Sequence, residues 1–94
     1  MSYSFSIRPA NKAELKSAIS AELDKVVLQQ PIHEIDRDTH EEAAGAMVDL
    51  VRDPYENEDM TASVAGSCWG DIADGKVKAL NGGSINVSVG FTPK

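Results

Sequence analysis

Two spacings of hydrophobic residues alternate along the chain, and each predicts a different kind of element. From Ser2 to Arg8, apolar residues hold every second position with serines between them, which is typical of a strand with one buried face. From Asn11 to Gln29, apolar residues recur at steps of three and four, which predicts a helix with one buried stripe. The strand's apolar residues are Tyr3, Phe5 and Ile7, and those of the helix are Leu15, Ile19, Leu23, Val26 and Val27.

Local signals predict where these two elements end. Pro9 should end the strand, because proline has no N–H to donate to a ladder. Asn11 suits the N-cap of the helix, and Glu14 stands three residues on, as in a capping box. Pro31 disfavours helical geometry in the residue before it, so the helix should end near Gln30.

A second helix is predicted to begin at Thr39, after a connection over residues 31–38. Thr39 and Glu42 fit a capping box, and acidic residues in a first turn are favoured by the helix dipole. The helix should end by Asp53-Pro54. Its inward stripe is predicted to be Ala43, Met47, Leu50 and Val51, while Ala44 and Ala46 are small enough to let a neighbouring helix approach.

The remainder of the chain predicts a polar loop over Asp53–Met60, the most mobile segment expected, and then three strands. The strands are Thr61–Trp69, weakened in its middle by Gly66, then Lys76–Leu80 and Ser84–Phe91. Asn81-Gly82-Gly83 is typical of a turn between the last two, since these residues reach positive φ readily. In the last strand Ile85, Val87, Val89 and Phe91 should face one way.

The predicted order is therefore β-α-α-β-β-β in one α+β domain over residues 1–94. A chain of 94 residues with 41% hydrophobic residues suits a single core. The simplest arrangement is a mostly antiparallel sheet with both helices packed on one face and water on the other.

Acidic residues are concentrated in one part of the chain. The net charge is −6, yet residues 34–59 hold ten acidic residues against two arginines. A region of this sign repels phosphate backbones, so direct nucleic-acid binding through it is disfavoured. It could instead attract a basic protein surface, including one that normally holds nucleic acid. The ten are Glu34, Asp36, Asp38, Glu41, Glu42, Asp49, Asp53, Glu56, Glu58 and Asp59.

Candidate chemical sites are weak. His33 and His40 lie among carboxylates and could bind a transition metal, but their spacing matches no standard motif, and a solvated, helix-capping role is preferred. Cys68 could pair with a histidine as a nucleophile, but it falls on the apolar side of its strand, which indicates a small buried hydrophobe. The glycine-rich segments are not phosphate-binding loops. No catalytic residue, metal site or cofactor is therefore predicted.

Two aromatic residues are candidate anchors for a protein partner. Trp69 is expected at a sheet end, where it either packs on a partner or covers the end of the core. Tyr55 lies in the acidic loop, where a solvated loop is the alternative to a docking patch. The residues predicted to contact a partner are Glu34, Asp36, Asp38, Asp53, Tyr55, Glu56, Glu58, Asp59 and Trp69.

The sequence also bears on compartment. One cysteine excludes an internal disulfide framework, and no signal peptide or membrane-spanning segment is predicted. A soluble protein of a reducing compartment, the cytoplasm, is the default expectation.

Three segments of the sequence resemble small accessory proteins encoded by bacteriophages: SFSIRPANKAELKSAI, ELDKVV…QQPIHEIDRD and the closing INVSVGF. The resemblance implies an acidic, non-enzymatic protein, and some proteins of this kind inhibit host defence systems, including CRISPR surveillance complexes. The leading hypothesis is thus a binding protein that docks its acidic region on a basic surface of a host complex. The alternative is a self-associating structural subunit of a virion, joined through the edge of the short lysine-bearing strand or through the solvated sheet face.

Overall fold

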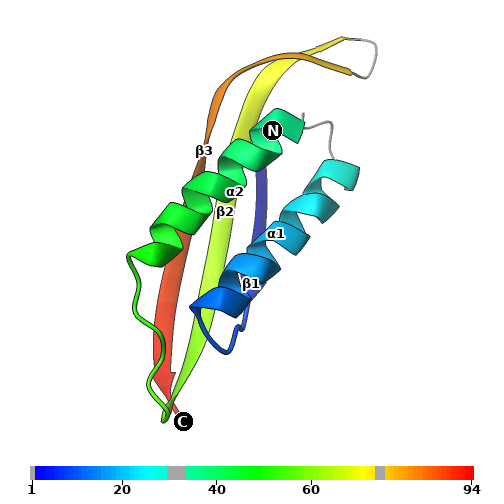
Figure 1. The fold of residues 1–94 in the computed structure, drawn as a ribbon. Coiled ribbons are helices and arrows are strands. Elements are labelled where there is room, and N and C mark those ends of the chain that lie inside the picture. Colours follow the sequence, from blue (N-terminus) through cyan, green and yellow to red (C-terminus); the bar gives the residue numbers. More distant parts are fainter. Residues whose placement is uncertain (1, 30–33, 74–75) are drawn as a thin grey trace.

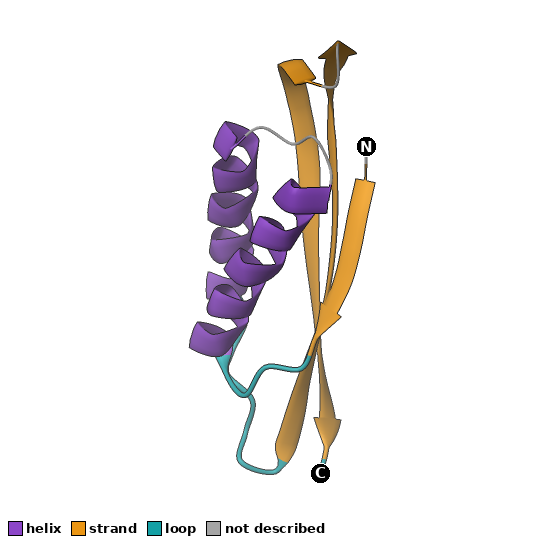
Figure 2. Cartoon of the chain, turned by 90° about the vertical axis from the view of Figure 1, so that its right-hand side faces the viewer, coloured by secondary structure: helices purple, strands orange, loops and turns teal. Residues whose placement is uncertain are grey.

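The protein is an α+β domain in which two helices cover one face of a three-stranded antiparallel sheet (Figures 1 and 2). The computed structural model describes residues 2–29, 34–73 and 76–94. Its elements are β1 (Ser2–Ile7), α1 (Lys12–Gln29), α2 (Glu34–Asp49), β2 (Glu58–Ala73) and β3 (Lys76–Pro93). The α+β class and the packing of both helices on one face are confirmed.

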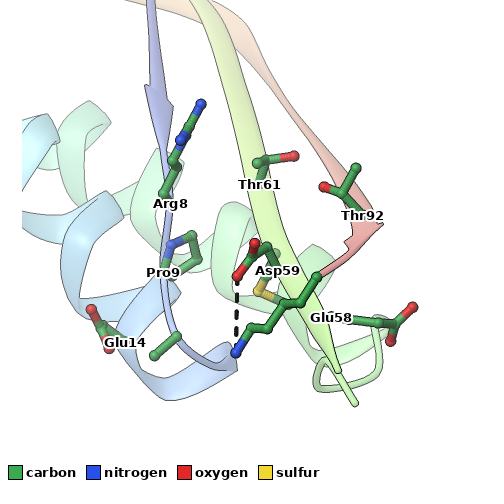
Figure 3. A pocket seen from close by; sticks show the side chains of 10 residues that line it. Arg8, Pro9, Glu14, Glu58, Asp59, Thr61 and Thr92 are labelled. Atoms are coloured by element: carbon green, nitrogen blue, oxygen red, sulfur yellow. Dashed lines mark ion pairs between the residues drawn. The ribbon is translucent and has the colours of Figure 1, made fainter. Parts of the chain in front are cut away.

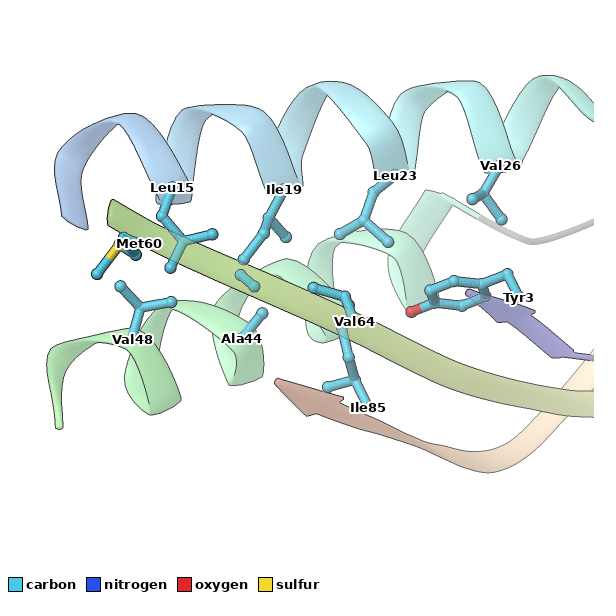
Figure 4. Packing of buried hydrophobic residues seen from close by; sticks show 11 residues of the cluster. Tyr3, Leu15, Ile19, Leu23, Val26, Ala44, Val48, Met60, Val64 and Ile85 are labelled. Atoms are coloured by element: carbon cyan, nitrogen blue, oxygen red, sulfur yellow. The ribbon is translucent and has the colours of Figure 1, made fainter. Parts of the chain in front are cut away.

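The first half of the chain follows its predicted spacing closely. β1 ends at Ile7, and α1 begins after Asn11, whose side chain Oδ1 accepts a hydrogen bond from the Glu14 N–H at 2.8 Å. The α1 stripe packs into the core, with Leu15, Ile19, Leu23 and Val26 all buried (Figure 4). The predicted N-cap is therefore confirmed, and so is the buried stripe except for Val27, which is only half-buried and lies outside the core cluster.

The second helix begins earlier than predicted and ends at Asp49, before Asp53-Pro54 as predicted. α2 begins at Glu34, so residues 34–38 are helical and Thr39 lies inside the helix, where its hydroxyl cannot cap the N-terminus. Ala44 and Val48 are the fully buried residues, while Ala43, Met47 and Val51 pack at the margin of the core. Leu50 is 89% exposed, so its predicted place in the inward stripe is wrong.

The sheet has three strands in the order β1-β2-β3 instead of four. β3 runs without interruption through Asn81-Gly82-Gly83, so the predicted turn there is wrong. The register between β2 and β3 shifts between Cys68 and Gly70, opposite Gly83 and Leu80, so this segment forms an irregularity inside the hairpin. The predicted inward face of residues 85–91 is confirmed, because Ile85 is buried and Val87, Val89 and Phe91 pack against the core.

The β2–β3 hairpin is longer than the rest of the sheet. β1 pairs with β2 only from Ala62 to Ser67, with Ile7 opposite Ala62 and Ser2 opposite Ser67. Beyond this pairing, β2 and β3 continue together to Ala73 and Lys76 and curve past the ends of the helices (Figure 1). The hairpin therefore ends in a two-stranded arm. No helix in the described part of the chain is long and apolar enough to cross a membrane.

Candidate binding surface

The acidic region follows α2 and continues into the loop over residues 50–57 and the start of β2. A helix of 16 residues is about 24 Å long, so the acidic residues at the start of α2 lie far from the loop, whereas Asp49 at its end directly precedes it. Glu34 and Asp36 belong to the first turn of α2, and their side chains lie outside the described residues, as does that of Trp69 in β2.

Carboxylates on α2 form a stripe, which we define as Asp38, Glu41, Glu42 and Asp49. These positions share one side of a 3.6-residue helix, and every member is exposed or half-exposed. The stripe borders α1, because Lys16 of α1 forms an ion pair with Asp49. Lys16 holds the pKa of Asp49 below its usual value, chiefly through a hydrogen bond.

Arg37 ties this side of α2 to α1. Its side chain is only 14% exposed and donates at 2.8 Å to Ser20 Oγ and at 3.0 Å to the Ser20 carbonyl. It also forms ion pairs with three carboxylates, those of Asp24, Asp38 and Glu41. Burial lowers the pKa of Arg37, but its hydrogen bond to Asp38 and the charges of Glu41 and Asp24 outweigh burial, so the pKa is raised. Glu42, by contrast, is exposed and has no ion pair among the described residues.

At the other end, several predicted contact residues have structural roles. Glu58 accepts two hydrogen bonds from Arg52, at 2.8 and 3.1 Å, and one from the Tyr55 N–H at 2.9 Å, and its side chain is only 18% exposed. Asp53 accepts a hydrogen bond at 2.8 Å from the Lys12 N–H at the start of α1. The Arg52 guanidinium lies 4.1 Å from the Tyr55 ring centroid and 3.9 Å from that of Phe91. These contacts run through the segment predicted to be the most mobile.

Other predicted contact residues remain accessible. Glu56 is exposed, and Asp59 is exposed with Lys94 Nζ at 4.0 Å from its Oδ1. The Tyr55 ring is exposed although Arg52 stacks on it. The loop end therefore presents Tyr55, Glu56 and Asp59, while Asp53 and Glu58 hold the loop in place.

A pocket of about 460 Å³ opens beside this end, where β1 has left the sheet and β2 and β3 continue (Figure 3). Charges of both signs line it, including Arg8, Glu14, Glu58, Asp59 and Lys94. The pKa of the Glu58 carboxyl is lowered by its hydrogen bonds to Arg52 and the Tyr55 N–H, which suits a fixed ion pair and not a general acid. The residues that line the pocket include neither histidine nor cysteine.

His40 is buried, contrary to its predicted solvated, helix-capping role. It is 6% exposed, and a hydrogen bond of 2.6 Å joins its Nδ1 to the Tyr3 hydroxyl. The signal that could have found it is its spacing of four and eight residues before Ala44 and Val48, which places all three on one helix face.

The metal and nucleophile alternatives depend partly on residues outside the described set. His33 and the Cys68 side chain fall there. Within residues 2–29, 34–73 and 76–94, no group of three or more histidine, cysteine or acidic side chains is placed to hold a metal ion.

Comparison of the chain with protein-family models, with curated proteins and with solved structures finds no match.

Proposed function

We propose that this protein is a non-enzymatic binding protein that docks the acidic stripe of α2 on a basic surface of a protein partner. The observation that supports this proposal is the composition of α2, whose 16 residues include six acidic residues and one arginine. Arg37 is one cation against three carboxylates, those of Asp24, Asp38 and Glu41, and Glu42 has no ion pair among the described residues, so this side of the helix keeps a net negative charge although Lys16 pairs with Asp49. Such a field speeds and orients association with a basic partner.

The partner we propose is a groove that normally holds nucleic acid. A row of carboxylates on a rigid helix can occupy the same lysine and arginine side chains as a phosphate backbone. The resemblance to phage accessory proteins makes a host defence complex, such as a CRISPR surveillance complex in the host cytoplasm, the class to test. Tyr55 and Trp69 are the candidate aromatic anchors, since aromatic residues supply much of the packing energy at interfaces.

The test is affinity capture from a bacterial host lysate with the whole protein as bait, at low and high salt and with added single-stranded nucleic acid. We expect one basic complex to be retained at low salt and released both by salt and by the competitor, because exposed charge contacts are screened. Retention that neither salt nor competitor changes would contradict the proposal, and so would recovery of the bait alone.

A charge-reversed variant ties the capture to α2. Glu42→Lys should weaken binding of the captured complex by about tenfold, or ~1.4 kcal/mol, without unfolding the domain, because Glu42 is exposed and has no ion pair in the described structure. Glu14→Lys is the matched control, since Glu14 is an exposed acidic residue on α1. Glu58 is unsuitable, because its loss would release Arg52 and Tyr55. Equal effects of the Glu42 and Glu14 substitutions would place the contact elsewhere.

A further inference from the structure

The side of α2 that faces away from α1 is uncharged over most of its length. Thr39, Ala43 and Ala46 follow each other at steps of three and four residues and so form one stripe, which Leu50 continues directly after the end of α2. Ala46 is exposed, and Leu50 is exposed to 89% although it is a large aliphatic residue. The acidic stripe lies on the other side, next to α1, as the Lys16–Asp49 ion pair requires.

Beneath this side of α2 lies the open edge of the sheet. β3 is an edge strand, and α2 packs over it while α1 lies toward β1 (Figure 1). From Ser84 to Thr92 the strand has no charged residue, no proline and no register irregularity. Natural edge strands usually carry at least one of these features, because unpaired N–H and C=O groups otherwise template pairing with another chain. This edge is therefore open to an added strand.

We propose that β3 of a second copy of this chain pairs antiparallel with this edge around a two-fold axis at Ser88. This register pairs the whole uncharged segment with itself. It places Val87 opposite the partner's Val89 and Ile85 opposite the partner's Phe91, all on the helix-covered face. The product is one continuous six-stranded sheet, in which the Ala43, Ala46 and Leu50 side of α2 lies beside its counterpart.

The distribution of charge leaves this edge available to a second copy. Two molecules of net charge −6 repel each other, so they can associate only where few charges face each other. The Ser84–Thr92 edge and the adjoining Thr39–Leu50 stripe contain no charged residue, and Arg52, which lies over the Phe91 ring at one end of this edge, is paired with Glu58.

The available area is also sufficient. Nine strand residues span about 30 Å, and a sheet layer plus a helix layer is about 20 Å deep, which gives roughly 600 Å² on each copy. The total of roughly 1,200 Å² lies at the lower end of the range for specific interfaces. The dimer should therefore be reversible, and it is independent of the function proposed for the acidic stripe.

Sedimentation equilibrium of the whole protein across a range of concentrations tests the dimer. We expect a reversible transition to twice the chain mass of 10.1 kDa. Leu50→Glu or Ala46→Glu should weaken this association at least tenfold, because each places a carboxylate of one copy next to the same carboxylate of the other copy. Leu28→Glu is the matched control, since Leu28 is 87% exposed at the end of α1 and should leave the dimer unchanged. A monomer at every concentration, a polymer without a limiting size, or equal effects of Leu50→Glu and Leu28→Glu would overturn the proposal.

A cysteine crosslink tests the register itself. In a Cys68→Ser background, Ser88→Cys places two thiols on opposing residues, whose Cα atoms are about 4.5–5.5 Å apart in an antiparallel pair, within reach of a disulfide. Copper–phenanthroline should then yield a covalent dimer. Asn86→Cys should not crosslink, because its two copies would be separated by more than ~13 Å. Crosslinking at position 86, or none at position 88, would overturn this register.

Discussion

At the scale of single residues, the Tyr3 ring covers Gly66 in the core. The two residues are opposite each other in the β1–β2 ladder, and a Cβ built on Gly66 would overlap the Tyr3 Cζ and hydroxyl oxygen. The ring cannot swing aside without breaking the hydrogen bond to buried His40. Gly66, which weakens a strand when considered alone, is thus needed where it stands.

Substitution by alanine should have opposite effects on stability at Gly66, which Tyr3 covers, and at Gly45, which has open space around it. Gly66→Ala should lower the free energy of unfolding by about 2 kcal/mol, because the added methyl group overlaps the Tyr3 ring. Gly45→Ala should raise it by ~0.5–1 kcal/mol, because Gly45 is helical and nothing lies within 4 Å of its added Cβ. Urea denaturation of both variants measures the difference. A Gly66→Ala protein as stable as the wild type would show that Tyr3 does not cover Gly66.

At the scale of elements, Glu58 joins the loop over residues 50–57 to the sheet, so the strength of this link depends on pH. Hydrogen bonds from Arg52 and from the Tyr55 N–H lower the pKa of Glu58 below its ordinary value of 4.5. A carboxyl whose pKa is lowered in the folded state stabilises the fold above its unfolded pKa, and this stabilisation is lost as the pH falls through the folded value.

We therefore expect the stability of the wild type to fall below about pH 4.5. Glu58→Gln should be less stable than the wild type at neutral pH, and its stability should fall less on acidification. Thermal melts of both proteins between pH 3 and 7 measure this, with Glu56→Gln as the control because Glu56 is exposed in the same loop. Parallel curves for the wild type and Glu58→Gln would remove Glu58 as the source of the acid sensitivity.

The elements that the sequence predicts well are those with a local and repeated signal. The stripe of α1, its Asn11 cap and the alternation in residues 85–91 each depend on near neighbours in the chain. The start of α2 has no such signal, because residues 34–39 contain a single apolar residue, Ile35, and so show no periodic stripe. Likewise, Asn81-Gly82 suits a bulge as well as a turn, and only pairing with β2 decides between them.

The candidate surface was predictable only as an excess of charge. Counting acidic residues identifies the region, but it does not show which carboxylates already form hydrogen bonds or ion pairs within the molecule. Glu58 accepts hydrogen bonds from Arg52, and Asp53 accepts one from the Lys12 N–H at the start of α1. Lys12 and Asp53 are 41 positions apart in the chain, so no local pattern indicates their contact. The burial of His40 depends in the same way on Tyr3, 37 positions earlier.

At the scale of the whole molecule, charge and uncharged surface are separated. The acidic stripe borders α1, while the α2 side next to the β3 edge and the outward side chains of Ser4, Ser6, Ser63, Asn86 and Ser88 are uncharged. The two proposed associations should therefore respond to salt in opposite directions.

We expect the dimer to tighten a few-fold between 50 and 500 mM salt, because ions screen the repulsion between two chains of net charge −6. Binding of a basic partner should weaken over the same range. Sedimentation equilibrium at both salt concentrations measures the first, and the capture experiment measures the second. A dimer that dissociates as salt is added would show that ion pairs hold it together.

The projecting β2–β3 hairpin gives the molecule extents of 51 × 21 × 16 Å and a radius of gyration of 14.5 Å. A globular chain of this length has a radius of gyration of about 12.4 Å. An elongated particle experiences more friction in solution than a sphere of the same mass, so a single copy should leave a gel-filtration column early and diffuse slowly. Elution volume alone would therefore exaggerate the number of chains in a particle, and only a method that weighs the particle directly can count them.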